Sequence, residues 1–268
     1  MEPQFYKGNR DAFMEKLAPG SLALFFSGVP VRKTADEDYA YFANRNFVYL
    51  TGMEQKDTIL MLEKDASGYR ETLFILPPNL IEERWTGARM KPEEIEAASM
   101  ISNFAYRDTF EEELKKVLAS GRIEKVYLDI DRMDGQVVVS GADSMETFLK
   151  QEYPNLLIEN SLPILKKLRL IKKPCEIRAM EKAQEITKAG ILAMMTHSKP
   201  GMYEYQYKAE YDYALAQHGV LEAGFPSIIS AGKNNFCIHY YGYRGQAMDG
   251  DIVLNDVGVR WDNELTDV

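Results

Sequence analysis

The sequence predicts an α/β protein with two domains. At 268 residues, the chain exceeds the usual size of a single hydrophobic core, which favours two domains. In the first half, short apolar segments rich in β-branched and aromatic residues alternate with amphipathic segments, as in strands interleaved with helices. Between residues 155 and 173 this pattern changes, and a long helical pattern follows. We therefore expect one α/β unit before the change and a second unit after it.

The first unit is expected to open with a helix and a buried strand. Pro77 and Pro78 close a later strand, and Pro154 ends a helix. Pro92 lies at an early helical position with two glutamates behind it, which is typical of a helix start. The expected helices span residues 11–17, 92–99, 110–118 and 144–152, and the expected strands span 21–26, 47–50, 58–62, 71–76 and 125–130.

The second unit is expected to begin with a long helix at Pro174. The apolar residues Ile177, Met180 and Ala183 recur at three-residue steps, which indicates one buried helical face. The helix should end near Ser198, because a Lys-Pro-Gly sequence follows it. A second helix is expected at residues 203–217, and residues 224–268 have the pattern of strands separated by glycines.

Composition and charge exclude several classes of protein. The chain is 46% hydrophobic and 27% charged, as is typical of soluble globular proteins. Its net charge is -9, with 41 acidic against 32 basic residues, and nucleic-acid binders instead concentrate Lys and Arg. The longer apolar runs, such as residues 22–26, are too short to cross a bilayer. We expect neither a nucleic-acid partner nor a membrane.

The cysteines and the N-terminus favour the cytoplasm. The first residues show no basic segment followed by an apolar one, so no secretory signal is visible. Cys175 and Cys237 have no metal-type spacing, and two scattered cysteines are most simply free thiols in a reducing compartment.

The chemistry is concentrated in the last thirty residues. Residues 251–259 have a strand pattern, and the chain must turn near residues 261–263 to form a second strand. A turn centred between Trp261 and Asp262 would place Asp256 opposite Asp267, with Cβ atoms about 4.5–5.5 Å apart. Two buried carboxylates at that distance repel each other unless one is protonated or a cation lies between them. A divalent metal, which takes oxygen ligands readily, would remove the conflict.

Spacing alone leaves a simpler interpretation open, and favours it. Asp256 and Asp267 could be exposed acids that flank a turn. A single histidine beside aromatic residues, such as His239, is more often a packed and hydrogen-bonded residue than a catalyst.

The joint pattern of motifs resembles the catalytic domain of aminopeptidase P and prolidase. The pieces are Gly-Phe-Pro-Ser-Ile-Ile at 224–229, Ser-Ala-Gly-Lys-Asn-Asn at 230–235, Ile-His-Tyr at 238–240, Asp-Gly-Asp at 249–251 and Asn-Asp-Val-Gly at 255–258. The resemblance implies that Asp256 and Asp267 are the first two ligands of a dinuclear metal site, usually manganese. It implies that His239 helps to bind substrate and to shuttle protons.

The resemblance extends upstream over nearly the whole chain. Arg-Asn-Phe-Val-Tyr-Leu-Thr-Gly at 45–52 and Glu-Arg-Trp-Thr-Gly-Ala-Arg at 83–89 resemble the N-terminal domain of the same family. Leu-Arg-Leu-Ile-Lys-Lys-Pro-Cys-Glu-Ile at 168–177 resembles the start of its catalytic domain. In relatives, the residue matching Trp85 can approach the active site of a neighbouring subunit, so Trp85 and Arg89 are candidates for a substrate or interface role. Methionine aminopeptidases share a similar Asp-x-Gly strand but lack this upstream domain.

The resemblance implies a fold and an activity. Residues 1–158 would form a creatinase-like N-terminal α/β domain with a mixed sheet, 159–173 a linker, and 174–268 the first part of a pita-bread α+β catalytic domain. The activity would be a metal-dependent exopeptidase that removes the N-terminal residue from peptides with proline in second position. Its partners would be proline-containing peptides and other copies of the chain, as a homodimer or higher homo-oligomer.

The chain departs from the family pattern at its end. In the family, a histidine and two glutamates beyond the second aspartate complete the metal site, whereas this chain ends at Val268. Two carboxylates make a poor site for a hard divalent cation, which takes about six donors. We therefore expect that this chain is a fragment of an enzyme and that the fragment alone is inactive.

Two alternatives remain. One is an Xaa-Pro dipeptidase (prolidase). The other is a non-catalytic pita-bread module that binds peptides or partners, although the presence of His239, Asp256 and Asp267 together weighs against it.

Overall fold

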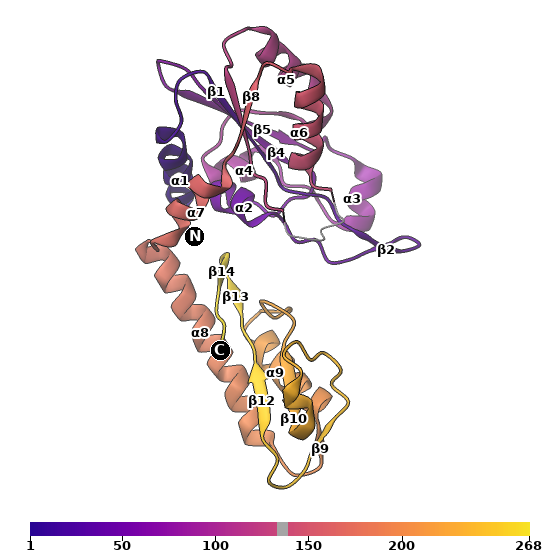
Figure 1. Ribbon diagram of the computed structural model, residues 1–268. Coiled ribbons are helices and arrows are strands. Elements are labelled where there is room, and N and C mark those ends of the chain that lie inside the picture. Colours follow the sequence, from indigo (N-terminus) through magenta and orange to yellow (C-terminus); the bar gives the residue numbers. More distant parts are fainter. Residues whose placement is uncertain (133–138) are drawn as a thin grey trace. The chain divides into compact units, whose positions relative to one another are not determined.

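The computed structural model describes residues 1–132 and 139–268, which form two compact units (Figure 1). The N-terminal unit comprises residues 2–171, and the C-terminal unit comprises residues 172–268 together with Met1. Residues 159–173, expected to link two domains, contain the end of a strand and the helix α7 (Leu162–Leu170) of the N-terminal unit.

A six-stranded mixed sheet forms the centre of the N-terminal unit, as expected from the resemblance. Its spatial order is β6-β5-β4-β1-β7-β8. The β1–β4 and β4–β5 pairs are antiparallel, and the β5–β6, β1–β7 and β7–β8 pairs are parallel. The strands are β1 (Ser21–Phe26), β4 (Ile59–Lys64), β5 (Tyr69–Ile75), β6 (Phe104–Tyr106), β7 (Lys125–Leu128) and β8 (Leu157–Asn160). A separate hairpin joins β2 (Arg32–Thr34) and β3 (Glu37–Asp38).

Helices cover both faces of this sheet, because side chains alternate along its strands. Leu22 and Leu24 of β1 belong to a buried cluster with α5 and α6, whereas Phe25 contacts Phe13 of α1 with ring centroids 5.2 Å apart. The helices of this unit are α1 (Pro3–Glu15), α2 (Arg45–Thr51), α3 (Leu80–Thr86), α4 (Pro92–Ser99), α5 (Phe110–Ala119), α6 (Gly141–Glu152) and α7, with a 3-10 turn at Arg107–Thr109.

The strand predicted at residues 47–50 is wrong, since these residues belong to α2. The side chain of Asn44 caps the helix by accepting hydrogen bonds from the backbone N–H groups of Asn46 and Phe47 (2.8 and 2.9 Å). Gly52 ends it in the left-handed conformation, with φ 73°. The segment is buried on every side, and a short apolar run of this kind has no periodicity that distinguishes a strand from a helix.

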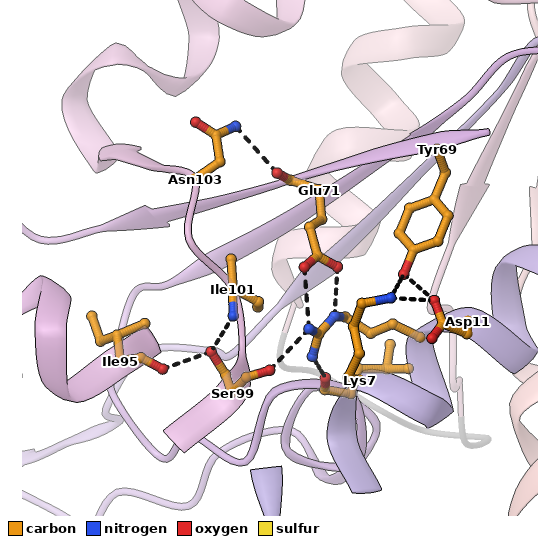
Figure 2. Close-up of polar contacts among 10 residues, drawn as sticks. Lys7, Asp11, Tyr69, Glu71, Ile95, Ser99, Ile101 and Asn103 are labelled. Carbon is orange, nitrogen blue, oxygen red and sulfur yellow. Dashed lines mark hydrogen bonds and ion pairs between the residues drawn. The ribbon is translucent and has the colours of Figure 1, made fainter. Parts of the chain in front are cut away.

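A buried arginine ties α1, α2 and α4 to the sheet, and its partners Glu71 and Ser99 are shown in Figure 2. Arg10 of α1 is fully buried and contacts the Glu71 carboxylate of β5 through Nε (2.7 Å) and Nη2 (3.2 Å). Its remaining donors reach the carbonyl oxygens of Leu50 (2.8 Å) and Ser99 (2.9 Å). One guanidinium therefore joins α1 to the ends of α2 and α4 and to β5, the strand next to the edge of the sheet.

The C-terminal unit packs two helices against short strands. Gly190 of α8 lets α9 approach closely, because a Cβ at this position would lie 2.4 Å from the Tyr211 ring. The helices α8 (Pro174–His197) and α9 (Glu204–Gln217) agree with the two predicted ones. The paired strands are β10 (Ile228–Ala231) with β12 (Val253–Asp256), β9 (Met202–Tyr203) with β11 (Gln246–Ala247), and β13 (Arg260–Trp261) with β14 (Glu264–Leu265); a 3-10 turn spans Gly232–Phe236.

Across the two described ranges, none of the helices combines the length and the apolar character needed to cross a bilayer.

Candidate metal site

The two candidate metal ligands lie on a β-hairpin whose turn is centred on Asp262 and Asn263. Both residues have positive φ (47° and 73°), which is the geometry of a two-residue type I′ turn. Asp and Asn tolerate this left-handed conformation, whereas Trp261 would be strained in it. The turn therefore lies one residue further along the chain than in the predicted register.

The shifted turn changes which residues face each other. Val257 and Val268 exchange backbone hydrogen bonds (3.0 and 3.1 Å), and the N–H of Thr266 donates to the carbonyl of Val259 (3.0 Å). Asp267 is thus opposite Gly258, and the predicted direct pairing with Asp256 is wrong. The displacement is two residues, and side chains alternate with a period of two, so both aspartates still lie on the same face as diagonal neighbours.

The two carboxyl groups interact in this arrangement. Burial raises the pKa of Asp256, and the charge and hydrogen bond of the Asp267 side chain raise it further. The charge of His239 acts in the opposite direction on the pKa of Asp256, as the smallest of its causes. The structure thus brings the Asp256 and Asp267 carboxyl groups into interaction.

Close packing holds the segment that carries Asp267, which follows β14, against residues 257–259, which follow β12. A Cβ on Gly258 would lie 1.9 Å from the carbonyl oxygen of Thr266, so only glycine fits in the Asn-Asp-Val-Gly motif. The Thr266 hydroxyl accepts a hydrogen bond from the N–H of Val259 (2.9 Å) and bonds to the hydroxyl of Thr187 in α8 (2.7 Å). The position of Asp267 is therefore fixed from both sides of the hairpin.

His239 lies in the loop between the 3-10 turn and β11, with an exposed side chain. Its ring stacks on that of Tyr241, with centroids 6.3 Å apart and planes at 22°. The neighbouring Tyr240 hydroxyl donates to the carboxylate of Glu204 at the start of α9 (2.8 Å). Glu204 does not stand out in the sequence, because nothing in a local pattern reveals that a glutamate in a first helical turn is buried.

Trp85 and Arg89 belong to the N-terminal unit, whereas His239, Asp256 and Asp267 belong to the C-terminal unit. Trp85 is 83% exposed on α3. Arg89 forms an ion pair with Glu82 and donates to the carbonyl of Pro77. Arg89 thus has a structural role around α3, and Trp85 presents an exposed aromatic surface.

The aspartate pair fits part of a site for a hard divalent cation. Both ligands are carboxylates, and a cation between them would relieve the repulsion that raises the pKa of Asp256. In the described part of the chain, no three His, Cys, Asp or Glu side chains are grouped closely enough to hold a metal ion. The pair could supply two ligands of a larger set.

Comparison with known families matches both units. The family described as "Aminopeptidase P, N-terminal domain" matches residues 6–127, and "Metallopeptidase family M24" matches residues 178–268. The chain belongs to the aminopeptidase P/M24 family. The M24 match covers His239, Asp256 and Asp267, and the N-terminal match covers Trp85 and Arg89.

Individual members of the aminopeptidase P/M24 family are similar along the whole chain. The Xaa-Pro aminopeptidase of Escherichia coli is 27% identical over 99% of this chain and 60% of its own length. A Bacillus anthracis protein, solved as a candidate aminopeptidase P, superposes with a TM-score of 0.95 at 31% identity, over 100% of this chain and 64% of its own. Aminopeptidase P from Escherichia coli with the inhibitor Pro-Leu superposes with a TM-score of 0.88 at 27% identity, over 100% and 61%. The chain thus spans about three fifths of the length of these relatives.

Proposed function

We propose that the protein carrying this chain is a metal-dependent exopeptidase that removes the N-terminal residue from peptides with proline in second position. The observation that carries the proposal is the interaction of the Asp256 and Asp267 carboxyl groups on one face of the hairpin, where the charge of His239 also acts on Asp256. The names of the relatives support the substrate class, as does the Pro-Leu inhibitor bound to the Escherichia coli enzyme.

Two divalent ions, Mn²⁺ in our proposal, would be held in part by Asp256 and Asp267. When bound, such ions polarise the scissile carbonyl and lower the pKa of a bound water. The two carboxylates would hold and orient the ions. The exposed imidazole of His239 can donate a hydrogen bond to the substrate and carry a proton at one ring nitrogen.

The 268-residue chain alone is proposed to be inactive. A hard divalent ion takes about six donors, and Asp256 and Asp267 supply only their carboxylate oxygens. The remaining donors would come from other parts of the natural-length protein. We also propose that the protein is cytoplasmic and assembles as a homodimer or higher homo-oligomer. In this assembly the exposed Trp85 would face a neighbouring subunit.

The test is hydrolysis of an Xaa-Pro-Xaa peptide with added Mn²⁺, by this chain and by the protein in its natural length. A matched Xaa-Ala-Xaa peptide and a free Xaa-Pro dipeptide are the controls. The proposal predicts release of the N-terminal residue from the first peptide only, and only by the natural-length protein. Preferred cleavage of the dipeptide would indicate a prolidase, and no cleavage without metal binding would indicate a non-catalytic module.

A further inference from the structure

The loop that carries His239 is wrapped around one buried carboxylate. Glu204, the first residue of α9, has no exposed surface. Its Oε1 accepts hydrogen bonds from the backbone N–H of Ala231 and from Nδ2 of Asn234, both at 2.8 Å. Its Oε2 accepts from the Tyr240 hydroxyl (2.8 Å) and from the N–H of Gly245 (2.7 Å).

These four donors are neutral groups, so the carboxylate is stabilised by hydrogen bonds. Burial acts to raise the pKa of Glu204, but the bonds from Asn234, Tyr240, Gly245 and Ala231 outweigh it and lower the pKa. A carboxylate that accepts several hydrogen bonds favours its charged form. Hydrogen bonds to an ionised acceptor are about twice as strong as those between neutral groups. Glu204 is therefore a strong anchor.

The donors lie on both sides of His239 in the loop. Asn234 precedes it by five residues, Tyr240 follows it directly, and Gly245 lies at the far end of the loop. The backbone at Gly245 touches the carboxylate so closely that a Cβ there would lie 2.5 Å from Oε1 of Glu204.

Apolar burial gives residues 236–238 of the loop little support, whereas Tyr243 further along packs against the core of the C-terminal unit. Phe236 is 93% exposed and Ile238 is 83% exposed. Asn235 anchors only the start of the loop, through the Ser230 hydroxyl (2.7 Å) and the Ile252 carbonyl (3.0 Å). Beyond residue 236, Tyr243 and Gly245 also bond to Ser227, Tyr205 and the Glu204 N–H. The bonds from Tyr240 and Asn234 to the Glu204 carboxylate are the ones that flank the imidazole directly.

We infer that Glu204 is the positioning residue for His239, acting through Tyr240 and the loop backbone and not through contact with substrate. The inference rests on the proposed function for its catalytic meaning, because His239 is the group that would meet the substrate. The structural part of the inference, that the charge of Glu204 orders the loop, does not depend on the proposed function.

The experiment compares Glu204→Gln with Glu210→Gln in this chain by NMR. Glu210 lies on the same helix, pairs with His197 (2.7 Å) and contacts none of the loop donors named above, so its variant controls for the loss of one carboxylate from α9. Glu204→Gln keeps the side-chain length but replaces one acceptor oxygen by an NH₂ group that faces donors. The readouts are the imidazole signals of His239, its contact with Tyr241, and amide hydrogen exchange.

We expect Glu204→Gln to broaden or average the His239 signals and to remove its contact with Tyr241. Amide exchange at residues 234–245 should rise at least about tenfold, while α8 amides stay unchanged. Tyr240→Phe leaves the buried charge in place and removes the hydrogen bond to Glu204, together with those that the hydroxyl accepts from Asn234 (3.1 Å) and from the N–H of Arg244 (3.5 Å), so it provides a variant that should fold in any case. It should loosen residues 237–245 selectively.

The inference would be overturned if Glu204→Gln and Tyr240→Phe both showed the same amide hydrogen exchange in the loop, and the same His239 signals, as the control Glu210→Gln. In the natural-length protein, Tyr240→Phe should lower kcat for an Xaa-Pro peptide about ten- to hundredfold with little change in KM. A wild-type protein that cleaves no Xaa-Pro peptide would contradict the proposed function. The NMR result would still decide the role of Glu204.

Discussion

Arg10 and Glu204 are two buried charged residues whose charges are stabilised by different kinds of partner. Arg10 has an ionic partner in Glu71 and two backbone carbonyls, so its charge is compensated inside the N-terminal unit. Glu204 receives only neutral donors. Substitution of Arg10 leaves the Glu71 charge without its partner, and substitution of Glu204 leaves buried donors without their acceptor, so both positions should be sensitive.

Arg10→Ala should lower the free energy of unfolding of the N-terminal unit by about 3–5 kcal/mol, since it leaves the Glu71 carboxylate and two carbonyls without their donor. Urea unfolding followed by circular dichroism measures the effect. Arg122→Ala, at an exposed position, is the matched control and should change the free energy by less than about 0.5 kcal/mol. Equal effects of the two substitutions would show that the guanidinium of Arg10 contributes no more than a surface arginine.

Glu204 should make the order of its loop depend on pH. Its folded-state pKa lies below the usual value of 4.5, so the stabilisation is present above pH 4.5 and is lost as the pH falls through the folded-state pKa. Several other carboxyl groups also have lowered pKa values, so the informative quantity is the difference between wild type and Glu204→Gln. Among its partners, Tyr240 titrates only at high pH, because burial and the bond to Glu204 raise its pKa. Loop exchange that rises equally in both proteins below pH 4.5 would contradict this assignment.

At the scale of helices and strands, the sequence predicts elements with strong local signals and fails where tertiary packing decides. The long helix α8 follows from Pro174 and its apolar stripe, and β1 from its run of buried apolar residues. The helix α2 could not be recognised, because burial on all sides removes the periodicity that separates a helix from a strand. The hairpin register depends on which two residues adopt positive φ at the turn. The predicted turn was one residue too early, so Asp267 lies opposite Gly258 and not opposite Asp256.

The α8–α9 contact should be sensitive to one added methyl group. Gly190→Ala places a Cβ 2.4 Å from the Tyr211 ring, and forcing these helices apart should cost about 1–3 kcal/mol in the C-terminal unit. Gly8→Ala in α1 is the matched control, because its Cβ would meet no atom within 4 Å. The control should stabilise the chain by about 0.5–1 kcal/mol through helix propensity alone. Thermal unfolding of both variants gives the comparison, and stabilisation by Gly190→Ala would show that this contact is not tight.

At the scale of the whole molecule, this chain holds part of the proposed chemistry. The chain holds two carboxylates whose repulsion a cation would relieve, and a histidine on a loop ordered by Glu204. The sequence predicted Asp256 and Asp267 on one face of a hairpin, and this part of the prediction survives because the register differs by an even number of residues. It could not locate Glu204, whose role depends on burial and on donors up to 41 residues away.

The most direct test of the account is to count bound Mn²⁺ and measure Xaa-Pro hydrolysis together in the natural-length protein and in its Asp256→Asn and Asp267→Asn variants. We predict that each substitution removes bound metal and lowers activity more than about a hundredfold, because substitution of even an outer-shell partner of a metal costs about 10- to 100-fold. Asp262→Asn, at the hairpin turn, should leave both quantities near wild type. Full activity and unchanged metal content in Asp256→Asn and Asp267→Asn would contradict the assignment of this hairpin as a metal site.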